Sequence, residues 1–74
     1  MKNIYPNLAA EMARKKLTQK KLGEMLGLKP VAIHSRLKGT TEFKFNEIVK
    51  LMGIFNKDFY ILFETEDIQK DFNN

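Results

Sequence analysis

Residues 18–39 constrain the fold more than any other part of the chain, because their small and apolar positions follow the spacing that two crossed helices require. Leu22 and Leu26 stand four residues apart on one face of a helix, and Gly23 lies beside them where a second helix must approach closely. Gly27 then provides the positive φ on which a helix commonly ends. The pattern predicts a short helix that is crossed at its glycine.

A second helix is predicted directly after a tight turn. Leu28 fills the turn, and Pro30 suits a first helical position because its missing N–H would be unpaired there in any case. Ile33 and Leu37 repeat the apolar pair, and Gly39 ends the helix. Two short helices joined in this way form a helix-turn-helix that needs a surrounding scaffold, and its second helix keeps one face free to enter a groove.

Helical spacing before this pair predicts a first helix over residues 5–16, with Leu8 and Met12 on its inner face. Either Asn3 or Asn7 is expected to cap its start. The helix-turn-helix is therefore expected to be preceded by one helix that packs against it.

Residues 46–55 and 59–63 predict a fourth helix and a short fifth one. Gly53 weakens the fourth helix by about 1 kcal/mol relative to alanine, which suggests close packing against a neighbour. Thr18 and Asp58 are expected to cap the second and fifth helices. The inner face of the fourth helix is expected to consist of Ile48, Leu51, Met52 and Phe55.

The length of 74 residues allows one domain, and the absence of cysteine excludes a disulfide framework or a Cys-ligated zinc site. No apolar run reaches 18 residues and no signal-peptide stretch is present, so we expect a soluble cytoplasmic protein without a membrane segment. The domain is expected over residues 1–63, followed by an acidic, partly disordered tail over residues 64–74. Ile68 and Phe72 are spaced for a conditional helix in that tail.

The charge of the chain is unevenly distributed. Residues 1–50 contain 11 Lys and Arg against 4 acidic residues, whereas residues 51–74 contain 2 Lys against 5 acidic residues. A basic excess around a helix-turn-helix is typical of proteins that bind a phosphate backbone. The alternative is a merely solubilising surface, and the motif favours the first interpretation.

These residues resemble the phage repressor and Cro class of XRE-type helix-turn-helix regulators over about residues 7–63. The resemblance implies an all-α, five-helix, lambda-repressor-like DNA-binding domain in which helices 2 and 3 form the motif. Residues 39–48 resemble small regulators of phages and mobile elements in Gram-positive bacteria, and a chain made of this domain alone resembles Cro. The matching residues are Leu17, Thr18, Gln19, Leu22, Gly23, Leu26, Gly27, Leu28, Ile33, Gly39, Thr41, Glu42, Phe43, Glu47 and Ile48.

The chain departs from this class in its third helix. Arg36 stands where many members have an apolar residue, and Leu37 stands where many have glutamate. The tip of the helix presents Pro30, Val31 and Ala32, whereas members that read bases usually present Gln, Ser, Asn or Arg. Few side chains for hydrogen-bonded base readout are therefore expected at the tip.

The resemblance implies a surface for double-stranded DNA. Gln19 is expected to reach a phosphate, Lys29 or Ser35 a guanine edge, and Val31 a thymine methyl group. His34, the only histidine, is expected to contact a phosphate or a base. The cations and threonines that follow His34 in the sequence would each be solvated if considered alone. Taken together, they favour phosphate contacts that hold one strand of the DNA. The predicted DNA-binding residues are Thr18, Gln19, Lys29, Pro30, Val31, His34, Ser35, Arg36, Lys38, Thr40, Thr41 and Lys44.

Two functions follow as hypotheses. The first is a sequence-specific transcriptional regulator of a phage genetic switch, which binds an operator as a homodimer with half-sites roughly 34 Å apart. The second is a modulator or antirepressor that docks onto a partner repressor protein, suggested by the apolar tip and the acidic tail. The predicted dimer or partner interface consists of Phe55, Phe59, Tyr60 and Phe63, with core packing as the alternative for the first and last.

An enzyme is not predicted. The chain has no Gly-rich phosphate loop, no cluster of metal-ligand residues and no nucleophile beside a base. Glu42 and Glu47 form a carboxylate pair, but their place at a helix start indicates compensation of the helix dipole. Neither a cofactor nor a metal is expected.

Overall fold

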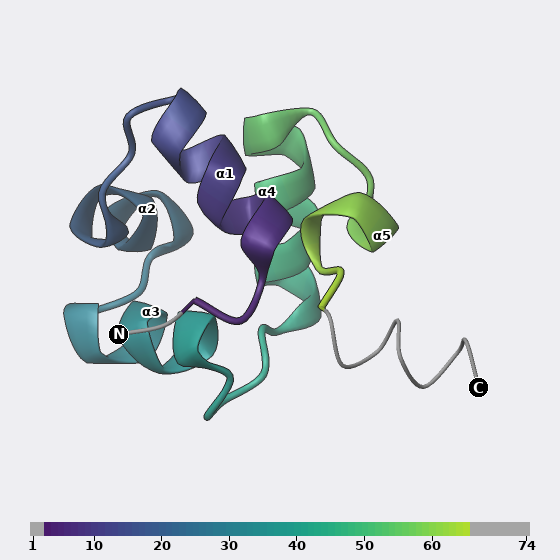
Figure 1. Cartoon of the computed structure of the whole chain (residues 1–74). Helices are drawn as coiled ribbons and strands as arrows, with labels where there is room; N and C mark the ends of the chain where they lie inside the picture. The colour runs from purple at the N-terminus through teal and green to yellow at the C-terminus, as the bar shows by residue number, and fades with distance from the viewer. Residues whose placement is uncertain (1–2, 66–74) are drawn as a thin grey trace.

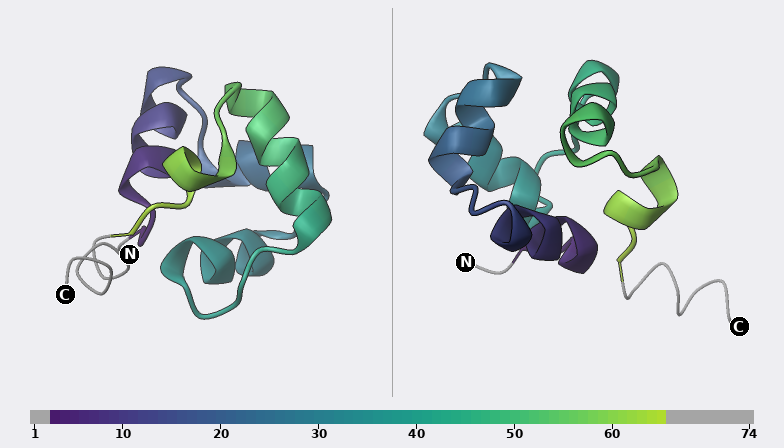
Figure 2. Two further views of the ribbon diagram at one scale, coloured as in Figure 1. Left: turned by 90° about the vertical axis from the view of Figure 1, so that its right-hand side faces the viewer. Right: turned by 90° about the horizontal axis from the view of Figure 1, so that it is seen from above.

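The computed structural model describes residues 3–65, and within that range the chain is all α-helical. α1 lies in the middle, with α2 and α3 on one side of it and α4 and α5 on the other (Figures 1 and 2). None of these helices is long and apolar enough to span a membrane. The predicted five-helix order is confirmed. The helices are α1 (Pro6–Arg14), α2 (Gln19–Leu26), α3 (Pro30–Lys38), α4 (Phe45–Phe55) and α5 (Phe59–Leu62).

The turn between α2 and α3 has the geometry that its glycines predict. A Cβ atom at Gly23 would lie 3.0 Å from the Leu28 carbonyl oxygen and 3.1 Å from Cγ2 of Ile33, closer than side chains normally pack. Gly27 ends α2 in the left-handed region, with a φ of 73°. The two helices can therefore cross tightly only because both positions lack a side chain.

The predicted caps are confirmed for α2 and α5 but not for α1. Thr18 Oγ1 accepts a hydrogen bond from the third backbone N–H of α2 at 3.1 Å, and Asp58 does the same for α5 at 2.9 Å. α1 instead begins after Tyr5, whose N–H donates to Asn3 Oδ1 at 2.8 Å. Asn7 lies inside the helix and donates to the carbonyl of Ile61, which ties α1 to α5.

α1 is also shorter than predicted. It ends at Arg14, and Lys16 takes a left-handed conformation with a φ of 56°. The N–H of Leu17 then donates to the Met12 carbonyl at 2.8 Å and turns the chain toward α2. Arg14 therefore closes α1, and the two cations that follow it, Lys15 and Lys16, lie on the corner between α1 and α2.

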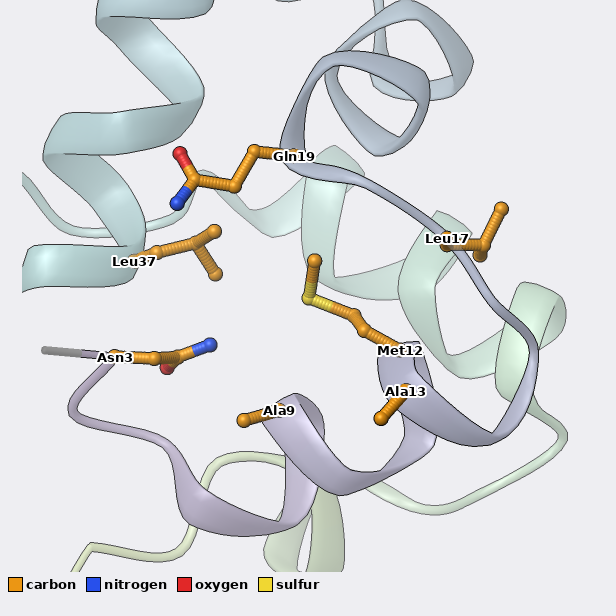
Figure 3. Close-up of a pocket in the computed structure, with 7 residues that line it drawn as sticks. All are labelled: Asn3, Ala9, Met12, Ala13, Leu17, Gln19 and Leu37. Atoms are coloured by element: carbon orange, nitrogen blue, oxygen red, sulfur yellow. The ribbon is translucent and has the colours of Figure 1, made fainter. Parts of the chain in front are cut away.

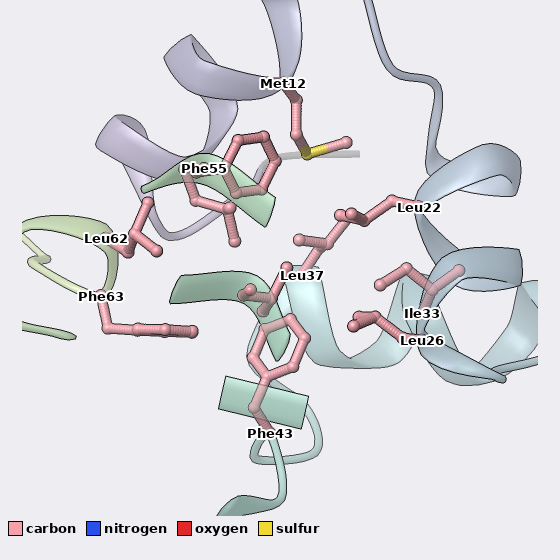
Figure 4. Packing of buried hydrophobic residues seen from close by; sticks show 11 residues of the cluster. Met12, Leu22, Leu26, Ile33, Leu37, Phe43, Phe55, Leu62 and Phe63 are labelled. Atoms are coloured by element: carbon pink, nitrogen blue, oxygen red, sulfur yellow. The ribbon is translucent and has the colours of Figure 1, made fainter. Parts of the chain in front are cut away.

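The core lies where α1, α2, α3 and α4 meet and is closed by α5 (Figure 4). On α4, Leu51 and Phe55 are buried as predicted, while Ile48 and Met52 are only partly buried against the core. The six side chains with essentially no exposed surface are Leu8, Leu22, Ile33, Leu37, Leu51 and Leu62.

Two of the four aromatic residues predicted at an interface belong to the core instead. Phe55 is 3% exposed and Phe63 is 8% exposed. The Phe63 ring packs edge-on against Tyr5 and Phe43, with centroid distances of 5.3 and 5.4 Å. Phe63 is thus enclosed by other aromatic rings of the same chain. These contacts inside one chain leave no surface of Phe55 or Phe63 for a partner. Phe59 and Tyr60 remain exposed.

The expected neighbour of Gly53 is not found among residues 3–65. A Cβ atom built at Gly53 would meet no atom within 4 Å, so the prediction of close packing against another helix of the same chain is wrong. The predicted helix around Ile68 and Phe72 lies outside the described residues.

Candidate nucleic-acid interface

One face of α3 points entirely away from the core. Val31, His34 and Lys38 recur at three- and four-residue spacing, so their side chains share this face, and all three are exposed. Val31 is 82% exposed, so its apolar side chain is available for contact on this face. Lys29 and Pro30 at the start of α3 are also exposed and extend the face at its tip.

The loop after α3 folds back onto the helix. Backbone N–H groups of Thr40 and Thr41 both donate to the Ser35 carbonyl, at 3.0 and 3.3 Å. The hydroxyl groups of Ser35 and Thr41 are hydrogen-bonded to each other at 2.9 Å. The structure thus brings Thr40, Thr41 and the exposed Lys44 next to the end of the outward face. The Ser35 hydroxyl is used in holding the loop.

Arg36 does not belong to this surface, contrary to the prediction. It is 8% exposed, and its Nε donates to Oε1 of Glu47 at 2.7 Å, while a terminal nitrogen donates to the Ala32 carbonyl at 3.3 Å. Its position on α3 faces inward, and Glu47 of α4 neutralises its charge there. A guanidinium that is buried and paired with a carboxylate in this way is not placed to bind a phosphate.

Glu47 joins α3, the following loop and α4 at one point. The same Oε1 atom accepts from the Lys44 backbone N–H at 2.9 Å, so this carboxylate also caps the start of α4. Burial alone would raise the pKa of Glu47, but the hydrogen bonds from Lys44 and Arg36 and the charges of both side chains lower it below its ordinary value. The sequence interpretation as dipole compensation missed its pairing with Arg36.

The lowered pKa of Glu47 predicts a specific loss of stability in acid. Because the folded state favours the charged carboxylate, its contribution is fully present above the ordinary pKa of 4.5 and is lost as the pH falls through the lower pKa of the folded state. We expect the urea midpoint to fall more steeply between about pH 5 and pH 3 in the wild type than in Glu47→Gln, which keeps the accepting oxygen. Parallel pH profiles would contradict the assignment.

The start of α2 lies near the end of α3. Gln19 is the first residue of α2, is half-buried, and directs its amide toward Leu37 at the rim of an open pocket of about 350 Å³ (Figure 3). Thr18 is exposed, but its hydroxyl caps the helix. The pocket is lined by Asn3, Ala9, Met12, Ala13, Leu17, Gln19 and Leu37.

Ile4, which the sequence did not single out, holds the end of α3. Its N–H donates to the Leu37 carbonyl at 3.0 Å. Gly39 ends the helix with a φ of 87°, and a Cβ atom there would lie 2.6 Å from Cδ1 of Ile4. The absence of a side chain at Gly39 therefore admits both the turn and this contact. No local periodicity signals such a contact between distant parts of the chain.

Because Arg36 is buried, the predicted surface contains three exposed cations along the outward face and the loop. They are Lys29, Lys38 and Lys44. Residues 3–65 contain no group of three or more His, Cys, Asp or Glu side chains that could hold a metal ion. The arrangement is an exposed helix face flanked by cations and by backbone of a tight loop, which is the arrangement that contacts the groove and phosphates of a duplex.

A family model described as helix-turn-helix matches residues 8–62, a range that spans all five helices. The chain belongs to the helix-turn-helix family. Membership of this XRE-type family supports a DNA-binding transcription regulator, and its members are generally regulators rather than enzymes. Comparison with curated proteins and with solved structures gives no significant match. In this helix-turn-helix protein the motif itself consists of α2 and α3.

Proposed function

We propose that this protein is a Cro-like, sequence-specific regulator that binds operator DNA as a homodimer, with α3 in the major groove. The observation that carries the proposal is the outward face of α3, where Val31, His34 and Lys38 are exposed together beside the folded-back loop. The resemblance of residues 39–48 to phage regulators supports a place in a phage genetic switch in the cytoplasm.

Each part of the surface has its own role in this proposal. Val31 contacts a thymine methyl group, and His34 and Lys29 contact base edges or phosphates. Gln19 and the positive end of α2 bind one phosphate, while Lys38, Lys44 and the threonines of the loop bind the strand on the other side of the groove. Because one recognition helix contacts too little DNA for tight specific binding, two copies on adjacent half-sites are required.

Neutralised phosphates make the proposed complex sensitive to salt. We expect log K to fall linearly with log[salt], with a slope of about −0.9 for each phosphate neutralised. Lys44→Ala is expected to reduce the magnitude of this slope by about 1 and to leave the sequence preference unchanged. Fluorescence anisotropy with a duplex selected from a random pool measures both.

Lys57→Ala is the matched control, because Lys57 is exposed but lies just beyond the end of α4 opposite to Lys44. Its slope is expected to equal that of the wild type. A complex whose affinity does not depend on salt would contradict the phosphate contacts of the loop.

Substitutions of Val31 separate direct DNA reading from the alternative, docking onto a partner repressor through the apolar tip. Val31→Glu places a negative charge near phosphates and is expected to abolish DNA binding, whereas Val31→Gln supplies a common reading side chain and preserves or retargets it. In an apolar protein pocket both variants are expected to weaken binding, because an unpaired buried amide costs about 1–3 kcal/mol.

Mobility shifts with the selected duplex, together with pull-down of a repressor encoded beside the gene, measure the two activities. Since Val31 is 82% exposed, circular dichroism is expected to show an unchanged fold in both variants. Unchanged DNA affinity in Val31→Glu would end the operator proposal and favour partner docking.

A further inference from the structure

α4 is apolar on nearly every side. Its 11 residues include only Asn46, Glu47 and Lys50 as polar side chains, and the carboxylate of Glu47 is buried in the ion pair with Arg36. A helix that is apolar all round is normally covered on all sides. In the single chain α4 lies at the periphery of the domain, with α5 and the core on its inner side (Figure 2). Its outer side carries the exposed Asn46 and Lys50, and the apolar surface beside them has no cover from the rest of residues 3–65.

The uncovered side is a stripe of three residues spaced four apart, Phe45, Val49 and Gly53, which we call the α4 stripe. Phe45 is 82% exposed, Val49 is 50% exposed, and the Cα of Gly53 faces open space. The partly buried Ile48 and Met52 continue the apolar surface along one edge of the stripe. A bulky ring thus stands at one end, and a gap the size of a side chain lies at the other.

We propose that the α4 stripe binds the α4 stripe of a second copy of this chain, antiparallel and around a two-fold axis that passes beside Val49. In a two-fold interface, residue i of one copy contacts residue j of the other, and the reverse contact follows. Phe45 and Gly53 lie about 6 Å from Val49 along the helix axis in opposite directions. Antiparallel pairing therefore places the Phe45 ring of each copy over the Gly53 gap of the other.

Three arguments favour a second copy of this chain as the partner of the α4 stripe. Glycine disfavours a helix, and no packing within residues 3–65 requires Gly53, whereas a close approach by another helix would require it. In an antiparallel pair, the Phe45 ring of each copy fits the open space at Gly53 of the other, so the stripe is complementary to a second copy of itself. Lys44, in the proposed DNA surface, directly precedes Phe45, so the contact lies near the duplex on which two copies would sit.

The size of the stripe sets the strength of the contact. It offers a few hundred Å² of apolar surface, about half of which comes from Phe45, compared with about 800 Å² per partner in a stable complex. We therefore expect weak, reversible dimers in solution. The homodimer of the proposed function, on which this inference rests, would gain its stability from two adjacent half-sites that raise the effective concentration of the copies.

A single introduced cysteine tests the geometry, because the natural chain contains none. Val49→Cys lies beside the proposed axis and is expected to form an intermolecular disulfide with its own copy under mild oxidation. Tyr60→Cys, at an aromatic residue that is 83% exposed on α5, is the matched control and is expected to react at least about tenfold more slowly. Faster cross-linking through position 60 would overturn the α4 stripe and favour α5 as the interface.

Sedimentation equilibrium with the full chain tests the energetics. Phe45→Ala and Gly53→Ala are each expected to raise the dimer Kd by about tenfold or more, and Tyr60→Ala is expected to leave it unchanged. In dilute, monomeric protein Gly53→Ala should raise Tm by several degrees, because alanine favours the helix and meets no atom there. Weaker association with higher stability cannot result from misfolding. A wild type that stays monomeric to about 1 mM, or an unchanged Kd in Gly53→Ala, would overturn the inference.

A duplex with one half-site of the selected sequence separates this inference from the proposed function. Phe45→Ala and Gly53→Ala are expected to bind one half-site like the wild type and to lose affinity only for the paired site. If the stripe variants bind paired half-sites as tightly as the wild type, the stripe is overturned and DNA binding stands. If the Val49→Cys variant cross-links but the wild type binds no duplex, the proposed function fails and the α4 contact is supported.

Discussion

Arg36→Ala is expected to lower the free energy of unfolding by about 3–5 kcal/mol, because it leaves the Glu47 carboxylate buried without its guanidinium. The two side chains are only 9% and 5% exposed, and their nearest N and O atoms are 2.7 Å apart. A domain of this size has about 5 kcal/mol of stability, so the variant is expected to be largely unfolded at 37 °C. Urea denaturation followed by circular dichroism measures the change.

Arg14→Ala is the matched control for burial. Arg14 also lies 2.7 Å from a carboxylate, that of Glu11, but its side chain is 67% exposed. Solvent screens such a pair, so we expect a loss of less than about 1 kcal/mol. The double variant Arg36→Met with Glu47→Gln removes both charges and retains the cap of α4, and it should recover much of the stability lost in Arg36→Ala. Equal losses in Arg36→Ala and Arg14→Ala would mean that burial does not govern the pair.

Leu22→Ala is expected to destabilise the motif strongly through the loss of apolar packing. Leu22 has no exposed surface and lies in the core where α2 faces α1, α3 and α4 (Figure 4). Truncating a buried leucine removes its apolar burial and leaves a cavity, which together cost about 2–5 kcal/mol. The thermal melt of this variant should therefore begin below 37 °C.

Met25 on the same helix provides the control, because its side chain is 42% exposed. Met25→Ala is expected to change stability by less than about 1 kcal/mol. If Leu22→Ala melts within two degrees of the wild type, Leu22 contributes little to the core, contrary to its burial.

The helix-turn-helix could be predicted from the sequence because its determinants are local. The spacing of Leu22, Gly23 and Leu26 specifies which face of α2 is buried and where α3 crosses it. Capping at Thr18 and Asp58 depends on atoms three residues away, so those helix starts were predicted correctly. Such features need no knowledge of the distant chain.

Apart from the start and end of α1, the failures of prediction depend on residues distant in sequence or on contacts that the sequence does not reveal. Arg36 looked like a DNA contact because nothing near it reveals Glu47, 11 residues ahead, as its partner. Phe63 was predicted at an interface with core packing as the alternative, and its contacts with the distant Tyr5 and Phe43 support the core. Gly53 suggested close packing against a neighbour, but within residues 3–65 no atom lies where a Cβ built there would meet it. Tertiary contacts override local patterns at such positions.

The contacts at the end of α3 mean that this helix depends on residues outside the motif and could not be moved alone into another protein. Ile4 holds its last turn from one direction, and Glu47 holds Arg36 from the other, and both come from outside the motif. A helix grafted into another scaffold would carry its outward side chains without these supports. If α3 reads DNA as proposed, new specificities should therefore be engineered in place, by varying Val31 and His34 while the inward Arg36 is kept.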